Sequence, residues 1–174
     1  MARSASNTNQ ESLLCVDYIN LYDYEAEQFF AYDDKSDFMP VIKKEDKEHL
    51  EVVIFGANSM GRAVARTLGH VAHYPNSQNA NHRSRITIVS ENIEEWAREF
   101  MVSHRGLFCL SNWMLTDANG VTELHSPVGE YGDYLDIEWH FVYGTSTSIE
   151  LESLFCENSV KRIVVCEDSD TQSI

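Results

Sequence analysis

The sequence has few basic residues, with 13 lysines and arginines against 28 aspartates and glutamates and a net charge of −15. Binding to a nucleic-acid backbone depends on clustered Lys and Arg side chains that neutralise phosphates. No such cluster is present in this sequence. We therefore expect that nucleic acid is not a partner.

Segments that would place the chain in a membrane are also lacking. The first ten residues are small and polar, without the apolar core of a signal peptide, and no apolar run is long enough to span a bilayer. The cysteines form no C-x-x-C pair and no local Cys/His pattern that would indicate zinc. They are Cys15, Cys109, Cys156 and Cys166. We expect a cytoplasmic chain with reduced cysteines, no direct membrane insertion and no metal site.

With 174 residues and 43% apolar content, the chain can fill one core. Residues 1–48 read as an acidic arm, because acids outnumber bases between residues 11 and 50. The arm is rich in aromatic residues, which predicts a strand or short helix packed on a neighbouring domain or subunit. The charged run at residues 43–48 is typical of a linker. We therefore place the start of a domain at residue 49 and assign residues 49–174 to it.

The stretch of residues 51–68 reads as a buried strand, a glycine turn and an amphipathic helix in succession. Gly56 can turn the chain sharply off the strand, and Gly61 lets the helix sit close to the sheet. The helix then presents free N–H groups and its positive dipole end, which suit a phosphate. This pattern is typical of a dinucleotide-binding α/β unit.

The rest of the domain repeats the alternation of strand and helix. The expected elements are a first helix over residues 60–73, strands at 85–90, 137–143 and 161–166, helices at 93–110 and 149–156, and an inserted hairpin over 113–128 with its turn at 117–120. Right-handed crossovers predict a Rossmann-like α/β fold whose parallel sheet has the strand order 3-2-1-4. This is little more than half of a doubly wound fold, so we expect a C-terminally truncated, incomplete domain.

Four segments in this order resemble the regulator-of-potassium-conductance family, whose TrkA-N-type nucleotide-binding domain regulates potassium channels and transporters. They are residues 56–62, the pair Ser90 and Glu91, residues 144–148, and the acidic turn at 164–174. The loop at residues 72–76 and the strand at 83–91 also look like those of large bacterial proteins with such a domain. The resemblance implies a site for NAD(H) or another adenine nucleotide. Its residues would be Gly56, Asn58, Ser59, Met60, Gly61, Arg62, Ser90, Glu91, Gly144, Thr145 and Glu167.

The chain departs from the family pattern at three of these positions. Asn58 stands in place of the second glycine, whose missing side chain lets the backbone approach the pyrophosphate. Ser90 stands where a ribose-binding acid is expected, with Glu91 one position later, and Thr145 replaces an aspartate. These departures leave open the alternative that the domain has lost its ligand.

The other residues with metal-binding or nucleophilic side chains are expected to have structural roles. His70 and His73 lie one helical turn apart, but helix ends attract histidines through the dipole and the local sequence offers no further ligand. His140 lies within a strand, which favours a packed residue over a base. Ser59 is not in a G-x-S-x-G elbow, so nucleophilic catalysis is not expected. The sequence therefore assigns no catalytic or metal residue, and an enzyme is the less favoured reading.

Three functions follow as hypotheses. The first is a regulatory module that binds NAD(H), ATP or AMP and controls an associated ion channel or transporter, with a homo-oligomer or a larger membrane transport protein as partner. The second is the NAD(P)-binding part of an oxidoreductase. The third is a Rossmann-like interaction domain that has lost its ligand. Fold analogy alone does not choose among them.

Overall fold

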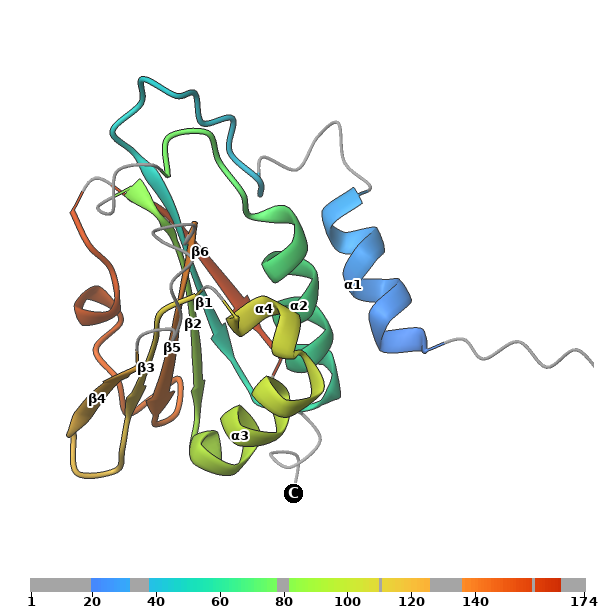
Figure 1. Ribbon diagram of the computed structural model, residues 1–174. Helices are drawn as coiled ribbons and strands as arrows, with labels where there is room; N and C mark the ends of the chain where they lie inside the picture. The colour runs from blue at the N-terminus through green and yellow to red at the C-terminus, as the bar shows by residue number, and fades with distance from the viewer. Residues whose placement is uncertain are drawn as a thin grey trace, which may run out of the picture.

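Helices and strands alternate along most of the chain and form a mixed α/β structure (Figure 1). The computed structural model describes residues 20–31, 38–77, 82–109, 111–125, 136–157 and 159–166. The strands are β1 (His49–Phe55), β2 (Ser84–Ser90), β3 (Trp113–Thr116), β4 (Thr122–His125), β5 (Ile137–Tyr143) and β6 (Ser159–Val165). The helices are α1 (Leu21–Ala31), α2 (Ser59–Val71), α3 (Ile93–Ser103), α4 (Arg105–Phe108) and the 3-10 helix η2 (Leu151–Leu154).

The six strands form one sheet in the order β4-β3-β5-β2-β1-β6. All pairings are parallel except that of β3 with β4, so the architecture is compatible with a Rossmann-like α/β fold. The order 3-2-1-4 predicted for the four parallel strands corresponds to β5-β2-β1-β6, whereas the full six-stranded order differs because the predicted hairpin, β3 and β4, extends the sheet beside β5. The hairpin is part of the sheet, because β3 pairs with β5 and places Trp113 and Leu115 against the main core.

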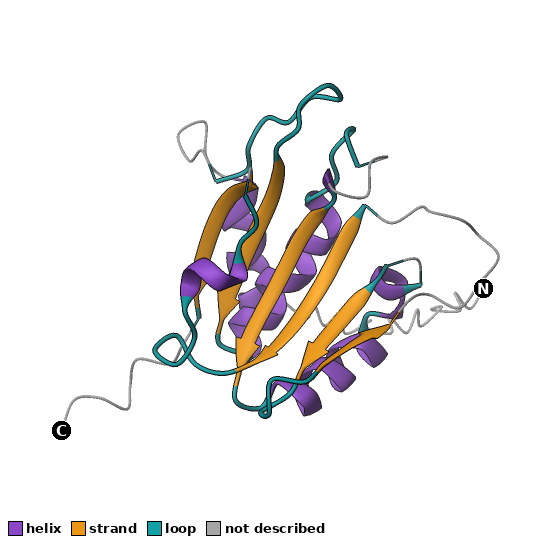
Figure 2. Cartoon of the chain, turned by 90° about the vertical axis from the view of Figure 1, so that its left-hand side faces the viewer, coloured by secondary structure: helices purple, strands orange, loops and turns teal. Residues whose placement is uncertain are grey.

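The helix face of the sheet, covered by α2, α3 and α4, carries the main core (Figure 2). Side chains alternate between the two faces of a strand. Leu50, Val52 and Ile54 of β1 accordingly point to the helix face, together with Ile86 and Ile88 of β2. They pack against the apolar side of α2 and α3, where alanines, Leu68, Trp96 and Phe100 are buried. This core fixes the carboxyl ends of the strands relative to the start of α2.

The other face of the sheet, here called the crossover face, is partly covered by the crossover segment, residues 144–157, which leads from β5 towards β6 (Figure 2). Val53, Phe55 and Val89 form a second, smaller apolar cluster there with side chains of the crossover segment. The predicted helix over residues 149–156 is wrong in length, because only the single turn of η2 forms. The backbone N–H of Cys156 instead donates to Glu51 Oε2 at 2.7 Å, which ties the chain down to the sheet.

The helix predicted over residues 93–110 is divided at His104. α3 ends at Ser103, and His104 leaves the helical conformation with φ −125° and ψ 42°. Its Nδ1 lies 3.1 Å from the Phe100 carbonyl oxygen, as in a C-terminal cap. The short α4 follows at once and brings Leu107 and Phe108 against the core.

The described part of the acidic arm contains one helix, α1, which packs on α2 of its own chain (Figure 1). Arg66 of α2 lies 3.2 Å from Asp23 and 3.4 Å from Glu27. The rings of Phe29, Phe30 and Phe38 meet edge to face beside them, with centroids 5.1 to 5.3 Å apart. The sequence predicted that the arm packs on a neighbouring domain or subunit; this segment finds its contacts within the chain.

Candidate functional site

The predicted nucleotide residues gather where four parallel strands end. Gly56 follows β1, Ser90 ends β2 and Gly144 follows β5. β1 and β2 are adjacent, as are β2 and β5, and Cys166 after β6 donates its N–H to the Phe55 carbonyl oxygen at 2.7 Å. Glu167 lies outside the described residues. The carboxyl edge of a parallel sheet is where open α/β folds bind ligands.

The turn between β1 and α2, residues 56–61, is named the glycine turn below. Gly56 has φ +103°, a left-handed conformation that side chains disfavour, and its N–H donates to the Val89 carbonyl oxygen at 3.1 Å. A Cβ atom on Gly61 would lie 2.0 Å from the Gly56 carbonyl oxygen. The first turn of α2 therefore approaches the end of β1 so closely that only glycine fits at position 61.

Asn58 caps α2 and also bridges to the next strand. Its Oδ1 accepts a hydrogen bond from the Gly61 N–H at 2.9 Å, and its Nδ2 donates to the Cys166 carbonyl oxygen. Within the part of the chain that the structure describes, the backbone N–H groups of Ser59 and Met60 donate to no protein acceptor. These two groups point out of the positive end of the helix dipole and are available to an anion.

Arg62 is directed away from the glycine turn and towards α3. Its Nη2 lies 3.1 Å from Glu99 Oε2, and its Cζ lies 5.6 Å from the centroid of the Trp96 ring. Both contacts belong to the packing of α2 against α3. In this arrangement the charge of Arg62 is balanced by Glu99, whereas the sequence suggested that it supports a phosphate.

The ends of β2 and β5 are joined by a hydrogen bond from the Gly144 N–H to the Ser90 carbonyl oxygen at 3.3 Å. Ser90 Oγ accepts from the Asn92 N–H at 3.2 Å, while Glu91 is exposed. Gly144 has φ +151°, and a Cβ there would lie 2.5 Å from Ile149. Thr145 is held in a local turn, because its N–H donates to Ser148 Oγ at 2.8 Å. Of these residues, Glu91 offers a carboxylate that is free to turn towards a ribose.

A buried polar cluster on the crossover face was not predicted from the sequence. Glu51 is the third residue of β1 and is 1% exposed. Arg85 Nη1 donates to Glu51 Oε1 at 2.8 Å and also lies 2.8 Å from Cys156 Sγ. His49 Nε2 lies 3.2 Å from Glu51 Oε1. Glu138 lies 3.7 Å from Arg85 Nη2. The sequence signal was a charged residue at position 51 at the start of an apolar strand, with an arginine in the neighbouring strand.

The environment of Glu51 keeps its carboxylate ionised. Burial raises its pKa, but the hydrogen bonds from His49 and from the Cys156 N–H, together with the charge of Arg85, outweigh burial and lower the pKa to about 2. The pKa of Arg85 is raised, because its bond to Cys156 and the charges of Glu51 and Glu138 outweigh the effect of its own burial. The cluster is thus a stable set of charges that compensate one another.

His49, Glu51 and Cys156 bring three potential metal-ligand atoms within 4.8 Å of one another. The guanidinium of Arg85 already contacts two of them at 2.8 Å. A buried cation that is paired in this way supplies the charge a metal ion would bring. We therefore assign these residues to the ion-pair cluster and not to a metal centre.

The two histidines that the sequence singled out, His70 and His73, do not act as a pair. His73 Nδ1 lies 2.6 Å from Asp136 Oδ2 and its Nε2 lies 3.1 Å from the Gly69 carbonyl oxygen. His70 is exposed at the end of α2. The contacts of His73 tie the end of α2 to the segment that enters β5, which is a structural role.

Comparison of the chain with protein-family models, curated proteins and solved structures finds no match. The resemblance to the regulator-of-potassium-conductance family therefore depends on the sequence motifs alone. None of the helices in the described ranges has both the length and the apolar character that a membrane span requires.

Proposed function

We propose that the carboxyl edge of the sheet binds an adenine nucleotide, NAD(H), ATP or AMP, and that the chain is a regulatory module. The observation that carries this proposal is the contact of Gly61 with the Gly56 carbonyl oxygen, where a Cβ would lie at 2.0 Å. Close approach of helix and strand at this glycine is the arrangement that exposes the helix N-terminus to a pyrophosphate.

The phosphates would lie against the N–H groups of Ser59 and Met60, since Gly61 already donates to Asn58. The exposed Glu91 at the end of β2 would accept hydrogen bonds from the ribose hydroxyls. At Gly144 the place of a side chain is filled by Ile149, so this glycine would contribute to the site through its backbone. Ligand binding at this edge requires no chemical step.

Regulation would follow from differential binding. A nucleotide that binds one packing of two such domains more tightly than another shifts the equilibrium between them. The resemblance of the sequence motifs suggests an ion channel or transporter as the protein that responds. This part of the proposal has the family motifs as its only support.

Asn58 favours a second candidate, an interaction domain without a nucleotide. Its side chain stands in place of the second glycine and forms a bridge between the Gly61 N–H and the Cys166 carbonyl oxygen. Such a bridge replaces part of what a phosphate would do at the helix start. In this reading the glycine turn is a structural remnant.

Calorimetric titration with NADH, NAD, ATP and AMP tests the two candidates. Ser59 is exposed at the first position of α2, so two variants change the charge there without touching the core. We expect S59E to weaken binding at least about tenfold by repulsion, although an acid at this position suits the helix dipole. S59K should bind as well as the parent chain or better.

The variant N58G separates the two candidates further. It restores the glycine of the family motif at a cost of only a few tenths of a kcal/mol in capping. Tighter binding by N58G supports a nucleotide site that Asn58 weakens. Absence of binding by the folded parent chain, S59K and N58G together would contradict the nucleotide proposal and leave the interaction domain.

A further inference from the structure

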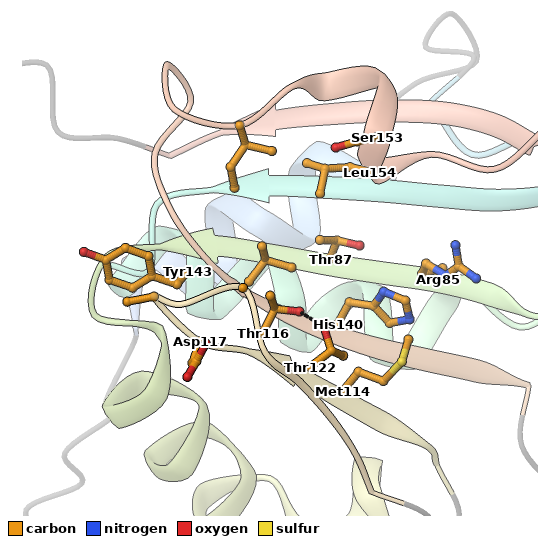
Figure 3. A pocket seen from close by; sticks show the side chains of 14 residues that line it. Arg85, Thr87, Met114, Thr116, Asp117, Thr122, His140, Tyr143, Ser153 and Leu154 are labelled. Carbon is orange, nitrogen blue, oxygen red and sulfur yellow. Dashed lines mark hydrogen bonds between the residues drawn. The ribbon is translucent and has the colours of Figure 1, made fainter.

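A cavity of about 480 Å³ lies on the crossover face of the sheet, outside the glycine turn (Figure 3). Its floor is formed by side chains of β2, β5 and β3, among them Thr87, His140 and Met114. Leu154 of the crossover segment covers it, and Thr122 of β4 lies at its side. Of the predicted nucleotide-binding residues that the structure describes, none lines this cavity.

Two buried nitrogen atoms of residues that line the cavity have no hydrogen-bond partner. They are Nε2 of His140 and Nε of Arg85, and neither has a partner in the described part of the chain. The two residues come from adjacent strands, since Thr87, two positions after Arg85, is the register partner of His140. An unsatisfied buried polar group costs about 1 to 3 kcal/mol. Such groups call for a partner, and both residues line the cavity.

The charges around the cavity indicate an uncharged partner. Burial, assisted by the charge of Arg85, lowers the pKa of His140 to about 4, so its ring is neutral at pH 7. The charge of Arg85 is already balanced by Glu51 at 2.8 Å and by Glu138 at 3.7 Å. Asp117 adds a negative charge to the lining. A phosphate or carboxylate would therefore find no uncompensated cation here.

The rest of the cavity lining mixes apolar and polar side chains. Val142, Met114, Ile149 and Leu154 contribute apolar surface, while Thr116, Thr122 and Ser153 contribute hydroxyl groups. A ligand must therefore present apolar surface as well as hydrogen-bonding atoms. The volume falls within the range of about 300 to 1,000 Å³ that is usual for small-molecule sites. Heteroaromatic rings combine an apolar face with acceptor atoms on an edge and meet both requirements.

We propose that this cavity binds an uncharged heteroaromatic molecule of nucleobase or nucleoside size, with acceptor atoms towards His140 and Arg85. Arg85 Nε–H donates to such an acceptor, and the neutral ring of His140 donates or accepts at Nε2 according to its tautomer. The hydroxyl of Thr87 lies beside them on the same floor. The site is separate from the nucleotide site at the glycine turn and does not depend on it.

NMR titration of the full chain, with ¹⁵N-labelled histidine and backbone amides, tests the proposal. The probes are adenosine, guanosine, cytidine and uridine, which carry no phosphate. We expect at least one of them to shift the His140 ring resonances in a saturable way and to leave the Ser59 and Met60 amides unchanged. AMP and NADH report separately on the glycine turn, so failure of one site is distinguished from failure of the other.

Two isosteric variants provide a matched comparison. Thr87 on the cavity floor and Thr67 in α2 are both buried threonines, at 2% and 7% exposure. We expect T87V to weaken nucleoside binding about 2- to 10-fold, the equivalent of one hydrogen bond, and T67V to leave it unchanged. H140F should abolish binding without loss of folding, because His140 Nε2 gives up no protein partner.

Two results would overturn the proposal. It fails if none of the four nucleosides shifts the His140 ring at millimolar concentration, which would leave water as the partner of the two nitrogens. It also fails if binding persists unchanged in both T87V and H140F. Shifts confined to the amides of the glycine turn would assign the nucleoside to the other site.

Discussion

Glu51 and Arg85 form an ion pair across β1 and β2, with Arg85 Nη1 2.8 Å from Glu51 Oε1 and the carboxylate side chain only 2% exposed. Glu51 Oε2 accepts from the backbone N–H of Cys156 at 2.7 Å. The same side chain therefore links two central strands to the end of the crossover segment. This link holds the segment that covers the cavity.

Replacing Glu51 with Gln should lower the free energy of unfolding by about 3 to 5 kcal/mol, because it leaves Arg85 partly buried without its closest counter-charge. Urea unfolding at pH 7 measures the effect. The matched control is E123Q on β4, where the side chain is 69% exposed, and its effect should stay within about 0.5 kcal/mol. Equal effects of the two variants would contradict a stabilising role of the buried pair.

The stability of the parent chain should fall in acid through protonation of Glu51. Its pKa in the folded state is about 2, below the ordinary value of 4.5. The contribution is therefore fully present above pH 4.5 and is lost as the pH falls towards 2. Urea unfolding between pH 7 and pH 2.5 should show the difference between the parent chain and E51Q shrinking over this range. A difference that stays constant with pH would rule out Glu51 as the titrating group.

G61A should destabilise the fold by at least about 2 kcal/mol, because the added Cβ meets a backbone carbonyl oxygen at 2.0 Å. Gly106 in α4 offers the matched control, since a Cβ there meets nothing within 4 Å. G106A should be neutral or stabilising by up to about 1 kcal/mol. Thermal unfolding of both variants checks the prediction. A G61A chain as stable as the parent would contradict the close approach of α2 to the end of β1 at this position.

A charge introduced into the interface between α1 and α2 tests whether the two helices pack together. Ala26 is 1% exposed, and A26D would place a carboxylate against α2 without a partner. We expect α1 to detach and limited proteolysis to cut within residues 20–31, while the core from residue 49 onwards stays resistant. Y24D adds the same charge at a position that is 55% exposed, and its cleavage should match the parent chain. Resistance of A26D to cleavage would contradict the packing.

Local patterns in the sequence predicted most of the regular elements. The apolar run at β1 and the strand of residues 137–143 occupy the positions expected, and Asp117 and Gly120 form the turn of an antiparallel hairpin. Gly56 and Gly61 stand where the turn from β1 to α2 requires them. These features depend on neighbours in the chain, which periodicity and turn chemistry report.

The predictions that were wrong concern features that depend on contacts between residues distant in the sequence. The hairpin joins the sheet because Trp113 and Leu115 gain burial beside β5. The crossover segment forms one turn instead of a longer helix because Cys156 is held by Glu51, which lies 105 positions earlier. Arg62 turns to Glu99 and Trp96 because α2 and α3 share one face of the sheet. No local pattern carries this information.

The sequence by itself determined the alternation of strands and helices, the acidic charge and the glycine turn, since these depend on residue type and spacing. Only the tertiary structure decided that Glu51 and Arg85 meet in the interior and that His140 faces a cavity with an unpaired nitrogen. Pairing of parallel strands aligns residues dozens of positions apart, and the side chains on one face become neighbours only after that register is set.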